Sequence, residues 1–130
     1  MPQGFFPVDP SLYNLSREDL SFLRLLTGIT DDEELKQHVL AIQAKAYEIC
    51  PYPCIRHFTF AKQPITRIPY YERVLAFGRE NPDALFLDLG CCFGSDLRKV
   101  VHDGWPVNRA IGSDLIPGKH AYTHSLYPKI

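Results

Sequence analysis

One stretch in the second half of the chain constrains the fold more than any other: an apolar run that meets a glycine turn. Residues 84–89 (ALFLDL) are apolar apart from Asp88, as in a strand buried on both faces. Gly90 and Gly94 follow, and then Leu97, Val100 and Val101 recur at helical spacing. A second short apolar run ends at Asp114. This order predicts a strand, a turn, a helix and a second strand, which together form a parallel βαβ unit.

The first half is typical of helices. Ser16 with Asp19 is a weak capping signal for a short leucine-rich helix, and Gly28 suits its C-terminus. Thr30 with Glu33 predicts a second cap, followed by apolar residues at steps of three and four from residue 35 to residue 49. Prolines punctuate residues 51–69, where residues 54–60 are β-prone but interrupted, and another short helix is expected from Tyr71.

Composition and charge exclude several classes of function. The 130 residues carry 14 basic and 15 acidic side chains, whereas a nucleic-acid binder that works through charge shows a basic excess. No apolar stretch approaches the ~18 residues of a membrane helix, and residues 1–10 lack the basic start of a secretory signal. We therefore expect no nucleic-acid or membrane partner and a cytoplasmic or nuclear protein. The four cysteines lack the spacing of a zinc site, so we expect no metal and reduced thiols.

The glycine turn is the part of the chain that indicates chemistry. Gly90 and Gly94 permit a tight turn and a close approach of the backbone to a ligand. The turn follows the carboxyl end of the first strand, where open α/β sheets bind ligands. Asp114 lies 20 residues beyond Gly94, where nucleotide-binding βαβ units hold ribose hydroxyls. The dinucleotide fingerprint does not match, because Cys92 and Ser95 stand where it needs glycines, which disfavours an oxidoreductase.

The string FLDLGCCFGSDLRKVVHDGWP, followed by IGSDL, resembles the first binding motif of class I S-adenosylmethionine-dependent methyltransferases. It is most similar to a fungal subgroup of secondary-metabolite, including meroterpenoid, biosynthesis. The stretch PYPCIRHFTF and the helix before the first strand also resemble that subgroup, so that the resemblance covers most of residues 30–115. It implies an α/β fold: an N-terminal helical or lid segment (residues 1–69) and a partial Rossmann-like, S-adenosylmethionine-binding βαβ domain (residues 70–130).

The resemblance also implies the roles of particular residues. Asp88 and residues 90–94 would line the methionine part of S-adenosylmethionine, Asp114 would take the ribose hydroxyls, and Leu115 would lie near the adenine. The expected cofactor-binding residues are Asp88, Leu89, Gly90, Cys91, Cys92, Phe93, Gly94, Asp114 and Leu115. The loop's usual middle glycine is Cys92 here. No residue is a persuasive general base, so the catalytic residues, the acceptor and the methylated atom stay open.

Length supports an alternative. A full class I domain has seven strands, and this sequence offers two, so that the chain resembles the N-terminal half of a methyltransferase. One reading is an enzyme, or its cofactor-binding half, that methylates a small-molecule acceptor in secondary metabolism. The other is a non-catalytic remnant that acts as an interaction module and self-associates through the edge of the strand at residues 84–89. The apolar stripe at residues 35–49 could cover one face of that sheet.

Several other residues have both a structural and a functional interpretation. Asp96 suits the first turn of a helix through the helix dipole, rather than catalysis. Cys91 and Cys92 fit as small packing residues better than as reactive thiols. Arg56 and His57, which could touch an acceptor or the cofactor carboxylate, are more often structural or exposed in an irregular segment. His120 and His124 are four residues apart but lack a third metal ligand.

Overall fold

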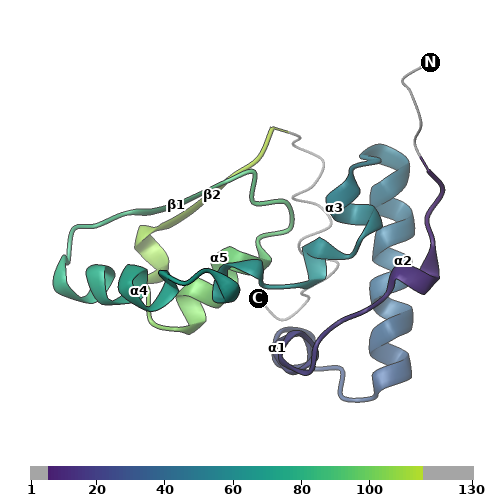
Figure 1. Ribbon diagram of the computed structural model, residues 1–130, viewed down its shortest axis with the longest axis horizontal. Coiled ribbons are helices and arrows are strands. Elements are labelled where there is room, and N and C mark those ends of the chain that lie inside the picture. Colours follow the sequence, from purple (N-terminus) through teal and green to yellow (C-terminus); the bar gives the residue numbers. More distant parts are fainter. Residues whose placement is uncertain (1–5, 116–130) are drawn as a thin grey trace.

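The computed structural model describes residues 6–115 as a helix-rich chain with one small parallel sheet (Figure 1). The helices are α1 (Arg17–Thr27), α2 (Asp32–Ile49), α3 (Pro53–Arg56), α4 (Tyr71–Glu80) and α5 (Ser95–His102), and the strands are β1 (Phe86–Leu89) and β2 (Ala110–Ser113). Four 3-10 turns join them: η1 (Pro10–Leu12), η2 (Thr59–Ala61), η3 (Pro64–Arg67) and η4 (Val107–Arg109). Within residues 6–115, no helix is long and apolar enough to cross a membrane.

The helix ends of the first half follow local hydrogen bonding. Ser16 and Asp19 form the expected capping box of α1, and Gly28 ends that helix in the left-handed conformation at φ 75°. The expected cap at Thr30 is wrong by one residue. Asp31 caps α2 instead, because its side chain accepts a hydrogen bond from the Glu34 amide. The helix ends at Ile49, two residues before Pro51, as predicted.

The β-prone stretch at residues 54–60 is not a strand. It forms α3 and η2, and Pro53 starts α3 at a position where the missing amide of proline is harmless. The buried side chain of Gln43 secures this segment, because its amide donates to the carbonyls of Ile55 and Arg56 at 3.2 and 2.9 Å. These bonds join α2 to residues that lie 12 and 13 positions later in the sequence, and they take the place of the ladder bonds that a strand would form.

The predicted βαβ unit is present. β1 and β2 pair in parallel, with Phe86 opposite Ala110 and Leu89 opposite Ser113, and α5 connects them. A small core beneath the sheet joins α4, α5 and the strands through Tyr71, Leu75, Val100 and Trp105. The ring of Trp105 packs edge-on against Phe86, with the centroids 5.5 Å apart.

The sequence predicts a first strand buried on both faces, and for β1 this prediction is wrong within the described residues. Only the face that carries Phe86 and Asp88 meets the helices, whereas Leu85, Leu87 and Leu89 are 65%, 54% and 74% exposed. Ile111 on β2 adds to this exposed apolar face. The stripe of α2 does not cover it, because Leu35, Val39 and their neighbours are buried in a separate core against α1, α3 and η2. Figure 1 shows α2 at the opposite end of the molecule from the β1–β2 sheet.

Candidate functional site

The turn between β1 and α5 is built from left-handed residues. Gly90, Cys92 and Gly94 have φ values of 70°, 53° and 75°. The Gly90 and Cys91 amides both donate to the carbonyl of Ser113 on β2, at 2.6 and 3.1 Å, and the Gly94 amide closes the turn onto Cys91 at 2.8 Å. Glycine accepts such φ values freely, whereas a left-handed non-glycine residue costs about 1–2 kcal/mol. Cys92 therefore holds a conformation that the surrounding contacts must enforce.

Asp114, which directly follows β2, is bonded to this turn. Its Oδ2 accepts a hydrogen bond from the Cys92 amide at 3.0 Å. The residue that the sequence predicts for ribose binding therefore lies against the glycine turn, as adjacent parallel strands require when both end at the same sheet edge.

A segment far away in sequence forms the opposite wall. The Ile65 amide donates to Oδ1 of Asp96 at 3.2 Å, and the hydroxyl of Ser95 donates to the carbonyl of Phe60. The Phe60 and Phe93 rings pack edge to face with centroids 5.1 Å apart. These contacts fix residues 59–65 against the first turn of α5, and they leave a cavity between that segment and the glycine turn.

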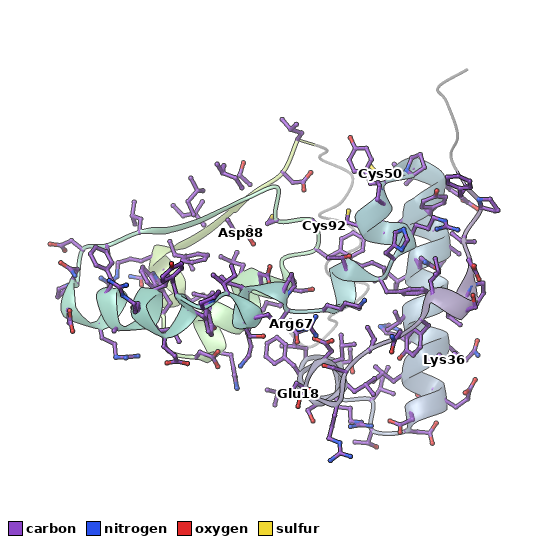
Figure 2. The ribbon with its side chains drawn as sticks, viewed as in Figure 1. Glu18, Lys36, Cys50, Arg67, Asp88 and Cys92 are labelled. Atoms are coloured by element: carbon purple, nitrogen blue, oxygen red, sulfur yellow. The ribbon has the colours of Figure 1, made fainter. Side chains whose placement is uncertain are left out.

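The cavity, called the cleft from here on, has a volume of about 340 Å³, within the range of small-molecule sites. Two of the residues that line it are labelled in Figure 2, with Asp88 beneath the sheet and Cys92 between the end of the sheet and α3. Its described lining residues are Tyr52, Cys54, Thr59, Phe60, Lys62, Pro64, Asp88, Gly90, Cys91, Cys92, Ser95, Asp96, Asp114 and Leu115.

Three carboxylates dominate the electrostatics of the cleft. Burial raises the pKa of Asp96 to about 6, and the hydrogen bond from the Ile65 amide opposes that rise. Burial also raises the pKa of Asp88 above its ordinary value, and the charge of Asp114 adds to the rise. Because burial disfavours the anionic forms of Asp88 and Asp96, the cleft is suited to a ligand that carries positive charge.

The predicted binding residues divide into two groups. Asp88, Gly90, Cys91, Cys92, Asp114 and Leu115 line the cleft. Leu89 is exposed, Phe93 is buried in the N-terminal core, and Gly94 caps α5 instead. The structure thus brings six of the nine predicted residues to one cavity.

Sequence reasoning missed the wall formed by the N-terminal segment. Thr59, Phe60, Lys62 and Pro64 line the cleft, but no spacing in the sequence indicates this, because the hydrogen bonds that hold this segment join Phe60 to Ser95 and Ile65 to Asp96, 35 and 31 residues apart. Asp96 does stand in the first turn of α5, as expected from the helix dipole, and it lines the cleft as well.

The remaining candidates lie outside the cleft or outside the described residues. Arg56 donates from its Nε to the carbonyl of Pro7 at 3.0 Å and packs over the ring of Phe6, so its contacts are with the N-terminal arm. His57 does not line the cleft, and His120 and His124 lie beyond residue 115. Within residues 6–115, no three histidine, cysteine or acidic side chains are placed to hold a metal ion.

Comparison with known proteins confirms the resemblance drawn from the sequence. Residues 8–61 match the family described as the meroterpenoid methyltransferase N-terminal domain. The chain is similar to fungal methyltransferases of secondary metabolism. No solved structure gives a significant match.

Three relatives illustrate the extent of the similarity. O-methyltransferase atr3 of Stereocaulon alpinum is 45% identical over 83 residues, which are 64% of this chain and 24% of the relative. The asnovolin E/chermesin D methyltransferase nvfJ of Aspergillus novofumigatus is 42% identical over 85 residues (65% and 30%), and methyltransferase ausD of Aspergillus calidoustus is 38% identical over 88 residues (68% and 31%). The chain therefore spans about a quarter to a third of the length of these relatives.

Proposed function

We propose that the chain provides the cofactor-binding cleft of an S-adenosylmethionine-dependent methyltransferase that acts on a small molecule in fungal secondary metabolism. The observation that carries the proposal is the convergence of the glycine turn, Asp114 and residues 59–64 on one cavity. In this proposal the βαβ unit is the start of a Rossmann-like sheet, residues 70–130 are the cofactor-binding part, and residues 1–69 are a helical segment that covers it.

The residues present fit S-adenosylmethionine. Gly90 lines the cleft, and a Cβ built on it would meet no described atom within 4 Å, so that the space beside its backbone is open. The cleft also offers carboxylates to a ligand whose sulfonium and ammonium are both cationic. Asp88 and the turn from Gly90 to Cys92 would hold the methionine part, Asp114 the ribose hydroxyls, and Leu115 the adenine.

The cofactor, when bound, supplies an electrophilic methyl group on its sulfonium. The chain's own contribution is to hold and orient the cofactor: the open side of Gly90 lets the ligand approach the backbone closely, and residues 59–64 exclude water from one side of the cleft. We assign no general base among these residues, so the proposal covers binding of the cofactor and does not cover activation of the acceptor.

The proposal is tested by calorimetric titration of the 130-residue chain with S-adenosylhomocysteine, the demethylated product. We expect weak, saturable binding, because the chain spans a quarter to a third of its relatives, and we expect none with NAD⁺. Gly90→Val should abolish the binding heat. If the chain shows no binding heat with S-adenosylhomocysteine, or binds NAD⁺ equally well, the proposal is wrong.

A second candidate function rests on a different observation. The exposed apolar face formed by Leu85, Leu87, Leu89 and Ile111 favours an interaction module, since contiguous exposed apolar patches mark association sites. In this alternative the cleft is a remnant of ancestry, and the β1 edge associates with a second copy of the chain. The cofactor titration separates the two candidates, because only the first requires ligand binding in the cleft.

A further inference from the structure

Lys62 has an unusual position for a lysine. It follows η2 directly, between Ala61 and Gln63, which are 0% and 3% exposed. Its amide donates to the carbonyl of Thr59 at 3.0 Å, while the Gln63 amide donates to Oδ1 of Asp19 at 3.3 Å. The backbone on both sides is therefore anchored, and Lys62 itself is half-buried and lines the cleft.

Lys62 is also the only cationic side chain among the described residues that line the cleft. Its ammonium makes no ion pair with any carboxylate in the described part of the chain. By contrast, Arg67 pairs with Asp19 and Lys99 pairs with Asp103, at 3.1 and 2.7 Å. An ammonium that has no carboxylate partner in the wall of a partly enclosed cleft gains from an anion that a ligand brings.

The cleft thus presents both signs of charge. Asp88, Asp96 and Asp114 repel an anionic ligand, and Lys62 repels a purely cationic one. A zwitterionic α-amino acid group satisfies both sets, because its ammonium suits the carboxylates and its carboxylate suits the lysine. The segment that matches the meroterpenoid methyltransferase N-terminal domain ends at residue 61, so Lys62 carries this selectivity from just beyond it.

We propose that Lys62 binds the carboxylate of the amino-acid end of the cofactor, and that it makes the cleft selective for ligands bearing that group. This inference rests on the proposed function and deepens it. Lys62 is a specificity-determining residue in this account, with no part in the transfer of the methyl group.

The test compares two ligands that differ at the amino-acid end. S-adenosylhomocysteine carries the amino acid, whereas 5′-methylthioadenosine keeps the adenosine and the thioether but lacks it. For Lys62→Met we expect affinity for S-adenosylhomocysteine to fall about tenfold, as for a partly exposed charge-assisted contact, and affinity for 5′-methylthioadenosine to stay unchanged. Lys62→Arg should keep most of the affinity for S-adenosylhomocysteine.

Lys45→Met is the matched control, because Lys45 is exposed on α2 and does not line the cleft. It removes the same charge, and it should change neither affinity. Thermal unfolding of each variant verifies folding, and Lys62→Gln replaces Lys62→Met if the apolar side chain prevents folding.

The possible outcomes distinguish a failure of the role of Lys62 from a failure of the proposed function. If the unsubstituted chain binds neither ligand, the proposed function fails and the role of Lys62 fails with it. If the chain binds both ligands and Lys62→Met weakens both equally, or weakens neither, the cofactor site stands and the role of Lys62 is wrong.

Discussion

The amide of Cys92 donates to the carboxylate of Asp114 at 3.0 Å, so the end of β2 holds the middle of the glycine turn. Asp114 therefore has two tasks in the proposed site: it supports a left-handed cysteine at φ 53°, and it offers a carboxylate to the ribose. A ligand that binds this carboxylate meets a turn that is already formed, which reduces the ordering cost of binding.

Substitution of Asp114 should separate the two tasks. Asp114→Ala removes the acceptor of the Cys92 amide, so we expect it to lower the free energy of unfolding by about 1–2 kcal/mol and also to weaken cofactor binding. Asp114→Asn keeps an acceptor for the amide but loses the charge. It should unfold like the original chain and still bind S-adenosylhomocysteine more weakly, by calorimetry. Unchanged affinity in Asp114→Ala would make Asp114 a structural turn residue only.

The backbone at Gly90 tests whether the cleft needs close approach. Gly90→Ala imposes a φ of 70° on an L side chain, at a cost of about 1–2 kcal/mol, and it places a methyl group in the cleft. Gly104→Ala is the matched control, because Gly104 also has positive φ and open space but lies outside the cleft. Both variants should lose stability in urea titrations, Gly104→Ala at least as much as Gly90→Ala because its φ of 118° lies further from the left-handed helical region, while only Gly90→Ala loses ligand affinity. Equal affinity in the two variants would remove Gly90 from the site.

Asp96 predicts a dependence of stability on pH. Burial raises its pKa to about 6 from 3.8, so the folded chain holds this proton more tightly than the unfolded chain does. The contribution of Asp96 to stability is therefore full below pH 4 and is lost as the pH rises through 6. Two pKa units correspond to about 3 kcal/mol, which solvent screening of a partly exposed carboxylate reduces to roughly 1–2 kcal/mol.

Asp96→Asn isolates this effect, because the amide oxygen still accepts from Ile65. We expect the variant to be more stable than the original chain at pH 7.5 and about equal to it at pH 4. Subtracting the unfolding free energy of one chain from that of the other cancels the contributions of the other acids. These include Asp88, whose pKa is also raised, and Asp103, whose pKa is lowered. If the difference in unfolding free energy is the same at both pH values, the Asp96 carboxyl has an ordinary pKa.

The exposed face and edge of β1 predict self-association. Within residues 6–115, β1 pairs with β2 only, and Leu87 on its exposed face meets no covering helix. We expect light scattering to show a mass that rises with concentration, and Leu87→Lys to return the chain toward a monomer, since a charge on an edge strand opposes pairing. A concentration-independent monomer with strong amide protection at residues 86–89 would contradict this expectation.

The parts of the fold that the sequence predicts are those governed by local contacts. The cap of α1 joins Ser16 to Asp19, three residues away, and Gly28 ends the helix through its own φ, so both are visible in the sequence. The segment that carries Phe58 is different. Phe58 adopts φ 58° and packs against Tyr13, and Gln43 holds the carbonyls before it, so distant residues decide its structure. Propensity favours a strand there, and tertiary contacts override it.

The candidate site divides in the same way. The glycine turn and Asp114 are predictable, because strand order and parallel pairing place them at one sheet edge. The wall formed by Phe60 and Lys62 is not, because it depends on hydrogen bonds between residues 31 and 35 positions apart. The exposure of one face of β1 is not predictable either, because an apolar run has the same sequence pattern whether one face of the strand or both are covered.

Amide chemical-shift mapping during titration with S-adenosylhomocysteine tests the central claim most directly. We expect saturable shifts that cluster at residues 52–54, 59–64, 88–96 and 114–115, the parts of the chain that form the cleft. Exposed residues of α2 that do not line the cleft, such as Lys45, should show no shift. Shifts that map elsewhere, or no shifts at saturating ligand, would contradict the assignment of the cleft as a cofactor site.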